Sequence, residues 1–454
     1  MKPLVLKMKR VAGLDLAKDS IYGCIVDVQG LKAQKRFGTS LQDLILLHHW
    51  LKSHYVEYVV MENTGVYTEP VVTTLRTHFR VEVVNAADTK RKNRKKTDPE
   101  DAWWLSQLLL AGAIGPDKAI RGSFLPDAAR AELRELTRTK SRYTQQATVH
   151  KNRITKTFAR LNIKLPDVFR DNKFTYTALG IYEAIACGLS FDQLLQDLQT
   201  TREQLTGPAK GRISRRISFI HRHRDELETA LAQKTVKQIP RHHQLTLLLE
   251  LNQLSLVQDY LDLLTREIQT CLQTHPQFHE PYRLLLRIPG IGETTAAQIL
   301  GEIPPIEYFS SANQFASFAG VVPKVSKSGE VTYIGQITKR GSPYLRKALF
   351  QAAQVASMKK HTRMGQKFQR IYKRKGKGKG KVAWVAVARH LATIIWVILT
   401  RKEEYKEERY VKKPWYQARK KLEQKTIQAI AQELHKKGYR MTVYNLETGQ
   451  YLVN

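Results

Sequence analysis

The stretch RVAGLDLAKDSIYGCIVDV, Arg10 to Val28, contains two short apolar runs separated by the polar residues of AKDS. Runs of this length that are rich in Val, Ile and Leu are typical of buried β-strands. A helical pattern over residues 41–54 follows, and then two more apolar strand patterns over 55–63 and 81–86. This alternation predicts an α/β domain over residues 8–122, with helices packed on one sheet.

From about residue 125 the pattern becomes helical. Apolar residues recur at steps of three, four or seven along two stripes, which predicts two long amphipathic helices. We expect these helices to pair as an antiparallel coiled coil, or to dimerise, within a helical region over residues 123–280. The first stripe comprises Leu133, Leu136, Tyr143, Ala147, Ile154 and Phe158, and the second comprises Leu247, Leu251, Leu254, Leu261, Leu264 and Ile268.

Residues 281–400 are predicted to form a third, mainly helical domain. Its run VAWVAVARHLATIIWVIL, residues 382–399, is long enough to span a membrane, but Arg389 and His390 lie at its centre. A buried helix is therefore the better interpretation. The preceding tract KRKGKGKGK, residues 373–381, has the composition of a flexible basic linker.

The last segment, residues 401–454, is predicted to be a basic helical tail. A charged helix is expected over residues 416–437, followed by a hairpin with Gly449 in its turn.

The charge balance of the chain is strongly basic. Lys and Arg total 75 against 41 acidic residues, a net charge of +34, and the pI is about 10.0. Such an excess favours a polyanionic partner. The basic residues are spread along the whole chain and not along one amphipathic helix, so nucleic acid is preferred over a membrane surface.

The cysteines and the N-terminal sequence indicate the cellular compartment in which the protein is expected. The three cysteines, Cys24, Cys187 and Cys271, have no CxxC spacing, which suits a reducing compartment and argues against a zinc cluster. The N-terminus lacks an adequate signal-peptide core, so a cytoplasmic location is expected.

Four acids lie where ligands commonly bind in an α/β domain. Asp15 and Glu62 end two predicted strands, and Asp98 and Asp101 share one face at the start of a helix. If they converge, their oxygens suit two Mg²⁺ ions, or Mn²⁺, in phosphoryl transfer. The alternative is structural, with Asp98 as a helix N-cap and Pro99 at the first helical position. The residues alone leave both interpretations open.

Two further motifs suggest contacts to a phosphate backbone. In RIPGIGETTAAQIL, Gly290 and Gly292 precede a helix, as in a helix-hairpin-helix motif. The alternative is a tight interhelical turn without a ligand. A basic run just before the acids at residues 98 and 101 is predicted to grip nucleic acid; it comprises Lys90, Arg91, Lys92, Arg94, Lys95 and Lys96.

A candidate nucleophile lies in the segment from Phe318 to Leu349. Ser328 precedes a glycine and is followed by the cations Lys339, Arg340 and Arg346, which are also predicted to contact nucleic acid. No histidine lies near in sequence to activate a serine. On the residues alone, an exposed turn serine is the better interpretation of Ser328, as it is of Ser326.

The order of these motifs resembles that of the DEDD transposases of bacterial insertion sequences, the IS110 group, which is related to the Piv-type DNA invertases. The resemblance spans most of residues 10–400. It is carried by GLDLAK, VVMENTGVY, KTDPEDA, LRELTRTKSRYTQQATVHKNRITKTF, RIPGIGETTAAQIL, FAGVVPKVSKSG, GQITKRGSPYLRKAL and KVAWVAVARHLATIIWVIL.

The resemblance implies a RuvC-like, ribonuclease-H-like N-terminal domain, a coiled-coil middle and a C-terminal transposase domain. It implies that Asp15, Glu62, Asp98 and Asp101 bind Mg²⁺. It also implies that Ser328 forms a covalent phosphoserine link to DNA. The adjacent Trp103 and Trp104 stand where the family more usually has smaller residues, and the sequence leaves open whether they pack the helix onto the sheet or contact nucleic acid.

The partners that the resemblance implies are double-stranded DNA at the element ends and target, a structured guide RNA called bridge RNA, and further copies of the chain. In such a dimer or tetramer, one protomer's metal site works with another's serine. Two alternatives remain: a RuvC-like junction resolvase or nuclease that uses metal-bound water, and a non-catalytic nucleic-acid-binding scaffold.

Overall fold

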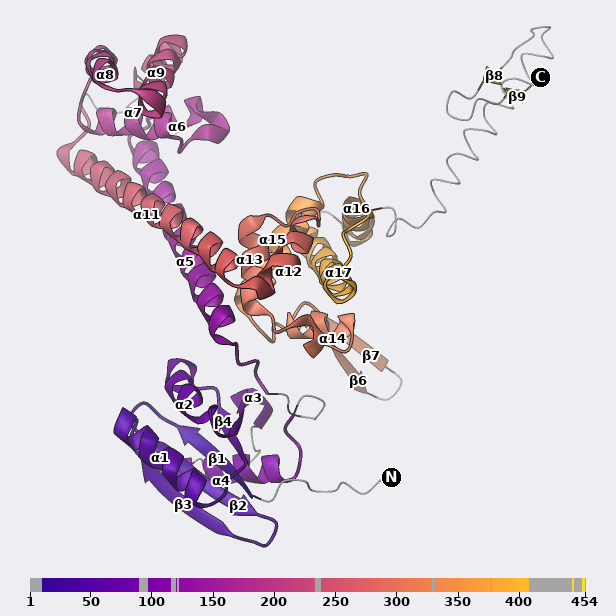
Figure 1. Cartoon of the computed structure of the whole chain (residues 1–454). Helices are drawn as coiled ribbons and strands as arrows, with labels where there is room; N and C mark the ends of the chain where they lie inside the picture. Colours follow the sequence, from indigo (N-terminus) through magenta and orange to yellow (C-terminus); the bar gives the residue numbers. More distant parts are fainter. Residues whose placement is uncertain are drawn as a thin grey trace. The chain divides into compact units, whose positions relative to one another are not determined.

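The protein folds into two compact units, residues 1–127 and residues 128–454, which are described separately (Figure 1). The computed structural model describes residues 10–89, 97–115, 120, 122–232, 238–328, 331–376, 378–407, 443–444 and 451–453.

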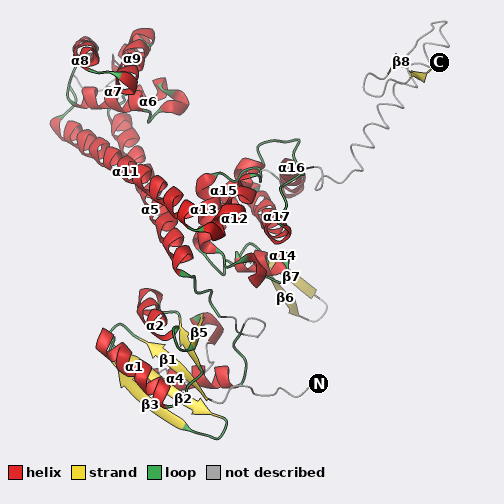
Figure 2. Ribbon diagram, in the orientation of Figure 1, coloured by secondary structure: helices red, strands yellow, loops and turns green. Residues whose placement is uncertain are grey.

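The first unit is built on a five-stranded mixed sheet with the order β3-β2-β1-β4-β5 (Figure 2). The first three strands of the chain are antiparallel neighbours, whereas β1, β4 and β5 run parallel. The strands are β1 Arg10–Leu16, β2 Ile21–Asp27, β3 Lys32–Phe37, β4 Tyr58–Glu62 and β5 Arg80–Val84.

Helices cover both faces of this sheet. On one face, α1 (Leu41–Ser53) and α2 (Thr68–Leu75) share an apolar core with alternate strand residues such as Leu14 and Met61. On the other face, α4 (Asp98–Leu110) packs on the remaining residues, among them Val60. The α/β domain predicted for this part of the chain is confirmed.

The contact between α4 and β1 is unusually close at Gly13. A Cβ atom at this position would lie 2.1 Å from the carbonyl oxygen of Ala102 and 2.6 Å from the backbone nitrogen of Ser106. Both atoms belong to the helix backbone, so α4 rests directly on the strand. No residue except glycine fits at this point without moving the helix.

In the second unit, α5 (Ala128–Arg160) and α11 (Arg241–Thr274) pack against each other over much of their length (Figure 1). The pairing is antiparallel, because the partner's residue number falls as the number on α5 rises. The pairs from one end to the other are Glu132 with His275, Tyr143 with Tyr260 and His150 with Glu250. The predicted pairing of two long helices is confirmed, and the two predicted stripes supply buried residues of their contact.

Five short helices pack beside the C-terminal half of α5 and the N-terminal half of α11, and they are called the distal helices below. Their apolar side chains form one core with those of α5 and α11. The core also holds the guanidinium of Arg216, which stacks 4.3 Å from the ring centroid of Tyr176 and donates a 2.8 Å hydrogen bond to its carbonyl oxygen. These helices are α6 Leu165–Val168, α7 Tyr176–Ala186, α8 Phe191–Gln204, α9 Gly207–Arg222 and α10 Arg224–Ala232, with a 3-10 turn at Arg170–Asn172.

The C-terminal part of the second unit is a helical module with its own core, which also takes in Leu133 of α5 and Ile268 of α11. An antiparallel two-stranded hairpin projects from it (Figure 2). The helices are α12 His279–Leu286, α13 Glu293–Glu302, α14 Ala312–Phe318, α15 Pro343–Ala356, α16 Arg363–Lys375 and α17 Gly380–Arg401. The strands are β6 Pro323–Ser328 and β7 Val331–Ile337, and 3-10 turns lie at Pro276–Phe278 and Ile306–Tyr308.

The helix α17 is the apolar run of the sequence. Among the described residues it is the one helix long and apolar enough to cross a membrane, with a mean hydropathy of 1.9. Its residues Leu391 and Ile395 are fully buried in the core of the module, while Arg389 is exposed. This matches the predicted buried core helix.

The linker predicted over residues 373–381 is shorter in the structure. The helix α16 continues to Lys375 and α17 begins at Gly380. The break falls at Gly376, whose φ of +89° is readily adopted by glycine.

A buried ion pair joins α5 to the C-terminal module. The Glu302 side chain is 1% exposed and accepts two hydrogen bonds from Arg138, at 2.6 Å and 2.9 Å. Arg134 donates to the neighbouring carbonyl of Gly301 at 2.9 Å. A bidentate pair of this kind fixes the angle and the register between two helices.

The tail holds the strand pair that the sequence predicts. The strands β8 (Val443–Tyr444) and β9 (Tyr451–Val453) are antiparallel neighbours. The turn with Gly449 and the helix predicted over residues 416–437 lie outside the described residues.

We predict that Gly13→Ala lowers the free energy of unfolding of the first unit by about 3 kcal/mol, because the added methyl group forces α4 off the strand. Urea denaturation of the full chain measures the loss. Gly211→Ala is the control, because a Cβ atom there meets nothing within 4 Å. An unchanged midpoint in Gly13→Ala would contradict the close packing.

A second prediction concerns acid. Burial, and then the neighbouring cations Lys367 and Arg363, lower the pKa of His390 from 6.5 to about 4. The neutral ring accepts a 2.9 Å hydrogen bond from Arg363. Between these two pKa values the unfolded chain binds a proton that the folded chain does not, so stability falls as the pH drops from 6.5 to 4.

Between pH 7 and pH 5 this one group removes about 2 kcal/mol of stability. His390→Gln keeps an acceptor but does not titrate, so over this interval it should lose about 2 kcal/mol less than the wild type. Urea midpoints at both pH values measure the difference. Equal losses in the two proteins would show that His390 is not held neutral.

Candidate functional site

Two of the predicted acids end neighbouring parallel strands on the same face of the sheet. In the β1–β4 ladder, Gly13 pairs with Val60 and Leu14 with Met61, so one step further along lie Asp15 and Glu62. Side chains alternate along a strand, so Asp15 shares the face of Gly13, and Glu62 that of Val60. This is the face that α4 covers. Both acids are half-buried.

The other two acids lie in the first turn of α4. Asp98 and Asp101 are one turn before Ala102 and Leu105, which are buried against the sheet. Ala102 lies over Gly13, and Asp15 is two residues, about 7 Å, further along β1. Asp15 and Glu62 therefore lie at one end of the sheet face that α4 covers, and Asp98 and Asp101 lie in the first turn of that helix.

The proposed capping role of Asp98 was wrong. The N-cap of α4 is Thr97, which has extended backbone angles, and Asp98 is already the first helical residue. The carbonyl oxygen of Thr97 accepts hydrogen bonds from the N–H groups of Glu100 and Asp101, both at 3.0 Å. The exposed Asp98 carboxylate is therefore not engaged as the N-cap of α4.

Glu62 is oriented by hydrogen bonds through Thr89 that were not predicted from the sequence. The buried hydroxyl of Thr89, in the short helix α3 (Ala86–Thr89), donates to Glu62 Oε1. Trp104 of α4 donates from its indole nitrogen to the Thr89 carbonyl oxygen at 2.9 Å. Sequence reasoning had no signal for Thr89 beyond its place next to the basic run. The indole of Trp104 thus joins α4 to α3.

Trp103 has a different environment. It packs against the core beneath α4, and the Nζ of Lys32 lies 5.4 Å from its ring centroid. Of the two interpretations left open by the sequence, the contacts of Trp103 agree with packing of α4 onto the sheet.

No three of the four acids form a tight ligand set in the described part of the chain. In the part of the chain that the structure describes, three ligand atoms within 4.8 Å of one another occur elsewhere, at Glu132, Cys271 and His275. The basic run Lys90–Lys96 lies outside the described residues, and its flanking residues are Thr89 and Thr97.

Ser328 is the last residue of β6 and pairs with Val331 of β7. It therefore lies at the tip of a hairpin in the second unit, whereas the four acids belong to the first. Ser326 lies two residues earlier and pairs with Tyr333.

The two glycines of the predicted helix-hairpin-helix differ in their surroundings. Gly290 has a φ of +89°, and a Cβ atom there would lie 2.4 Å from the carbonyl oxygen of Ala352 in α15. Its lack of a side chain thus serves close packing within the protein. Gly292 is the N-cap of α13 and has nothing within 4 Å. The acidic Glu293 follows it.

The three cations after the hairpin also differ. Lys339 and Arg340 are exposed. Arg346 turns inward, where its Nη1 donates to the carbonyl oxygens of residues 339–341 at 3.0–3.4 Å. Burial lowers the pKa of Arg346. Its contacts fold the loop before α15.

Comparison with known proteins defines the class. Residues 12–163 match a family model described as "Transposase", which covers the DEDD transposases of IS110 type. Residues 282–369 match the model "Transposase IS116/IS110/IS902 family". Both descriptions are of transposases, and the two matches follow each other in the chain.

The curated relatives point the same way. The chain is similar to the "Transposase for insertion sequence element IS1111A" of Coxiella burnetii, with 29% identity over 32% of this chain and 42% of that protein. It is 32% identical to the "Pilin gene-inverting protein" of Moraxella bovis over 31% of this chain and 44% of that protein. The "Putative transposase y4rJ" of Sinorhizobium fredii is 23% identical over 84% of this chain and 83% of that protein.

The match spans about half or less of the length of the first relatives, 42% and 51%. The two family models match residues 12–163 and 282–369, in the expected order of the motifs. Both models are of IS110-type transposases, so the chain resembles that family at both places.

Proposed function

We propose that this chain is an insertion-sequence transposase that cuts and rejoins double-stranded DNA at element ends and target, and that it acts in the cytoplasm. The observation that carries the proposal is the placement of Asp15 and Glu62 on adjacent parallel strands of the sheet face that α4 covers, together with Asp98 and Asp101 in the first turn of that helix. Four carboxylates of this kind, two of which closely follow a basic run in the sequence, suit a metal-assisted reaction on phosphates.

We assign the first unit to the RuvC-like, ribonuclease-H-like folds. The order β3-β2-β1-β4-β5, with three antiparallel strands followed by two parallel ones, supports this assignment. So does the position of the acids at the carboxyl ends of β1 and β4.

The residues fit Mg²⁺, which prefers carboxylate oxygens and retains several waters. Asp15, Glu62, Asp98 and Asp101 would hold one or two such ions. Bound there, the metal would supply charge stabilisation for phosphoryl oxygens. Thr89 would keep one lone pair of Glu62 engaged, which sets the direction in which its other oxygen points.

In the proposed reaction, Ser328 Oγ forms a bond to the scissile phosphorus, while one phosphodiester P–O bond breaks. The bonding electron pair leaves on the deoxyribose oxygen, which takes up a proton as the serine loses one. Attack by a DNA hydroxyl on the phosphoserine reverses these changes and joins new strands. The resemblance adds an oligomer, a dimer or tetramer, in which the acids and the serine come from different protomers.

The remaining contacts belong to the same proposal. The basic run from Lys90 to Lys96, Gly292 and the exposed Lys339 and Arg340 would touch the phosphate backbone of DNA or of a bridge RNA. Gly290 and Arg346 are weaker candidates, because the protein itself occupies their surroundings.

The main alternative is a RuvC-like nuclease or junction resolvase that uses metal-bound water and needs no serine. A non-catalytic nucleic-acid-binding scaffold is the third candidate function. Covalent attachment to DNA and metal dependence separate the three.

The test uses the full chain, with any RNA that copurifies, and a labelled duplex carrying the element's end junctions. In Mg²⁺ we expect the wild type to form a protein–DNA adduct that survives denaturing electrophoresis. Ser328→Ala and Asp101→Asn should each abolish it, and Ser326→Ala should retain it as the matched control.

An adduct formed by Ser328→Ala would overturn the nucleophile assignment. Cleaved DNA without any adduct would favour the nuclease, and metal-independent binding without cleavage would favour the scaffold. Sequencing the copurified RNA tests the guide.

A further prediction addresses the hydrogen bond from Thr89 to Glu62. Thr89→Val keeps the shape of the side chain but removes its hydroxyl, so the Mg²⁺ concentration for half-maximal cleavage should rise roughly tenfold. Thr74→Val is the control, because the Thr74 hydroxyl is exposed and bonds only its own helix in α2. Equal Mg²⁺ requirements in the two variants would contradict a role for Thr89 in the metal site.

A further inference from the structure

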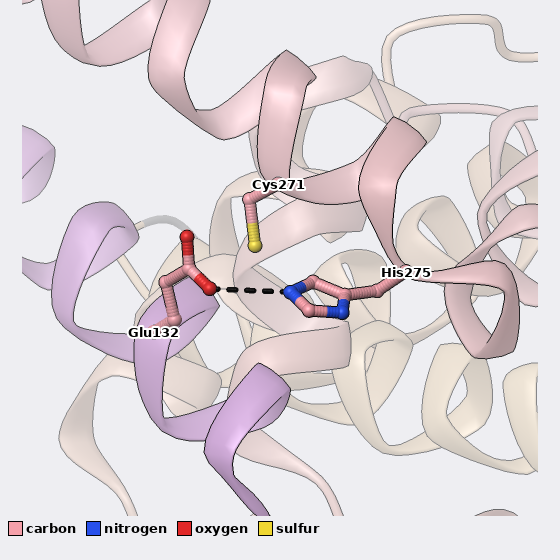
Figure 3. Close-up of side chains that lie close together, drawn as sticks. All are labelled: Glu132, Cys271 and His275. Atoms are coloured by element: carbon pink, nitrogen blue, oxygen red, sulfur yellow. Dashed lines mark hydrogen bonds and ion pairs between the residues drawn. The ribbon is translucent and has the colours of Figure 1, made fainter.

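Three different ligand types meet where the ends of α5 and α11 lie side by side. Glu132 comes from the first turns of α5, Cys271 from the last turn of α11, and His275 from the C-cap of α11. One ligand atom from each lies within 4.8 Å of the other two. Figure 3 shows the sulfur of Cys271 directed toward the gap between the carboxylate and the imidazole.

We propose that Glu132, Cys271 and His275 bind a zinc ion that clasps α5 to α11. The site lies in the second unit and is separate from the four acids of the first. It is also a different kind of site, because it offers one sulfur, one nitrogen and one oxygen in place of four carboxylates.

The donor set selects the metal. Thiolate and imidazole suit Zn²⁺, whereas Mg²⁺ prefers oxygen ligands, so a cell that holds both would sort them between the two sites. Cys271 and His275 are four residues apart, which places them on one face of a helix, and Glu132 approaches from the partner helix. Three protein ligands leave a fourth tetrahedral position for water or another donor.

The three ligand atoms would have to move only a short distance to reach the separations found in a zinc site. Glu132 Oε2 and His275 Nε2 are 3.2 Å apart. Ligand atoms in a tetrahedral zinc site with bonds of about 2.0–2.3 Å lie roughly 3.3–3.8 Å from one another. The pair already has nearly this separation, and the sulfur has to approach it from within 4.8 Å.

An alternative explanation needs no metal. Glu132 and His275 form an ion pair when the ring is protonated, and Cys271 is then a small apolar residue of the core. Burial raises the pKa of the Cys271 thiol to about 11, so without a metal it stays protonated at neutral pH. When zinc binds, a Zn–S bond replaces the S–H bond and the proton goes to solvent.

The zinc ion would join the N-terminal end of α5 to the C-terminal end of α11. Cys271 packs in the same core as Leu133, Ile268 and Leu272, and this core continues into the C-terminal module. A zinc ion at this point would restrain the ends of α5 and α11 where they enter the module.

The test uses the purified full chain after treatment with a chelator, with Co²⁺ as the probe. Thiolate bound to Co²⁺ gives a near-ultraviolet charge-transfer band that carboxylates cannot give, so ions bound by the first unit do not interfere. Zn²⁺ should then displace the Co²⁺ and remain at about one ion per chain after gel filtration.

We expect this band in the wild type and in Cys187→Ser, the matched control with an exposed thiol. Cys271→Ser should lose it, with an unchanged circular dichroism spectrum. His275→Gln and Glu132→Gln keep the thiol and should weaken zinc binding about tenfold or more.

Absence of the band in the wild type would overturn the proposal, and so would a band that persists in Cys271→Ser. DNA cleavage is not part of this readout, so the result does not depend on the proposed function.

Discussion

The contact between Gly13 and α4 is the constraint on which the first unit depends. Gly13 lies two residues before Asp15 and directly under Ala102, the residue that follows Asp101, because the backbone of α4 rests on the β1 backbone. Any side chain at residue 13 would raise the helix from the strand. The geometry of the candidate site therefore depends on a residue that has no chemistry of its own.

Much of this arrangement was predictable from sequence, because strong apolar patterns mark β1, β2, β4 and α4, and the acids fall at their ends. The edge strand β3 was not predicted, since Phe37 is its one buried residue and four of the other five are Lys, Gln or Arg. The cap at Thr97 and the hydroxyl of Thr89 were missed because neighbouring acids and cations dominate the local pattern. Glu132 could not be paired with Cys271 and His275, because nothing in the sequence records which faces of two distant helices meet.

Three buried or partly buried titratable groups of the second unit have defined partners. In a chain with a net charge of +34, the carboxylate of Glu302 neutralises a cation inside the module, and the buried Arg216 is held by the ring and carbonyl of Tyr176. His390 avoids charge altogether by staying neutral beside Arg363. Each of these groups would be costly without its partner, so each one specifies how its helices are packed.

The length of α5 has a consequence for whatever the second unit touches. The helix has 33 residues, which corresponds to about 50 Å. One of its ends is embedded in the core of the C-terminal module and the other in the core of the distal helices. At 3.4 Å per step, that span equals roughly 15 base pairs of duplex. The length of α5 thus sets the distance between the two cores. A nucleic acid duplex lying along the helix would need more than one full helical turn to reach both of them.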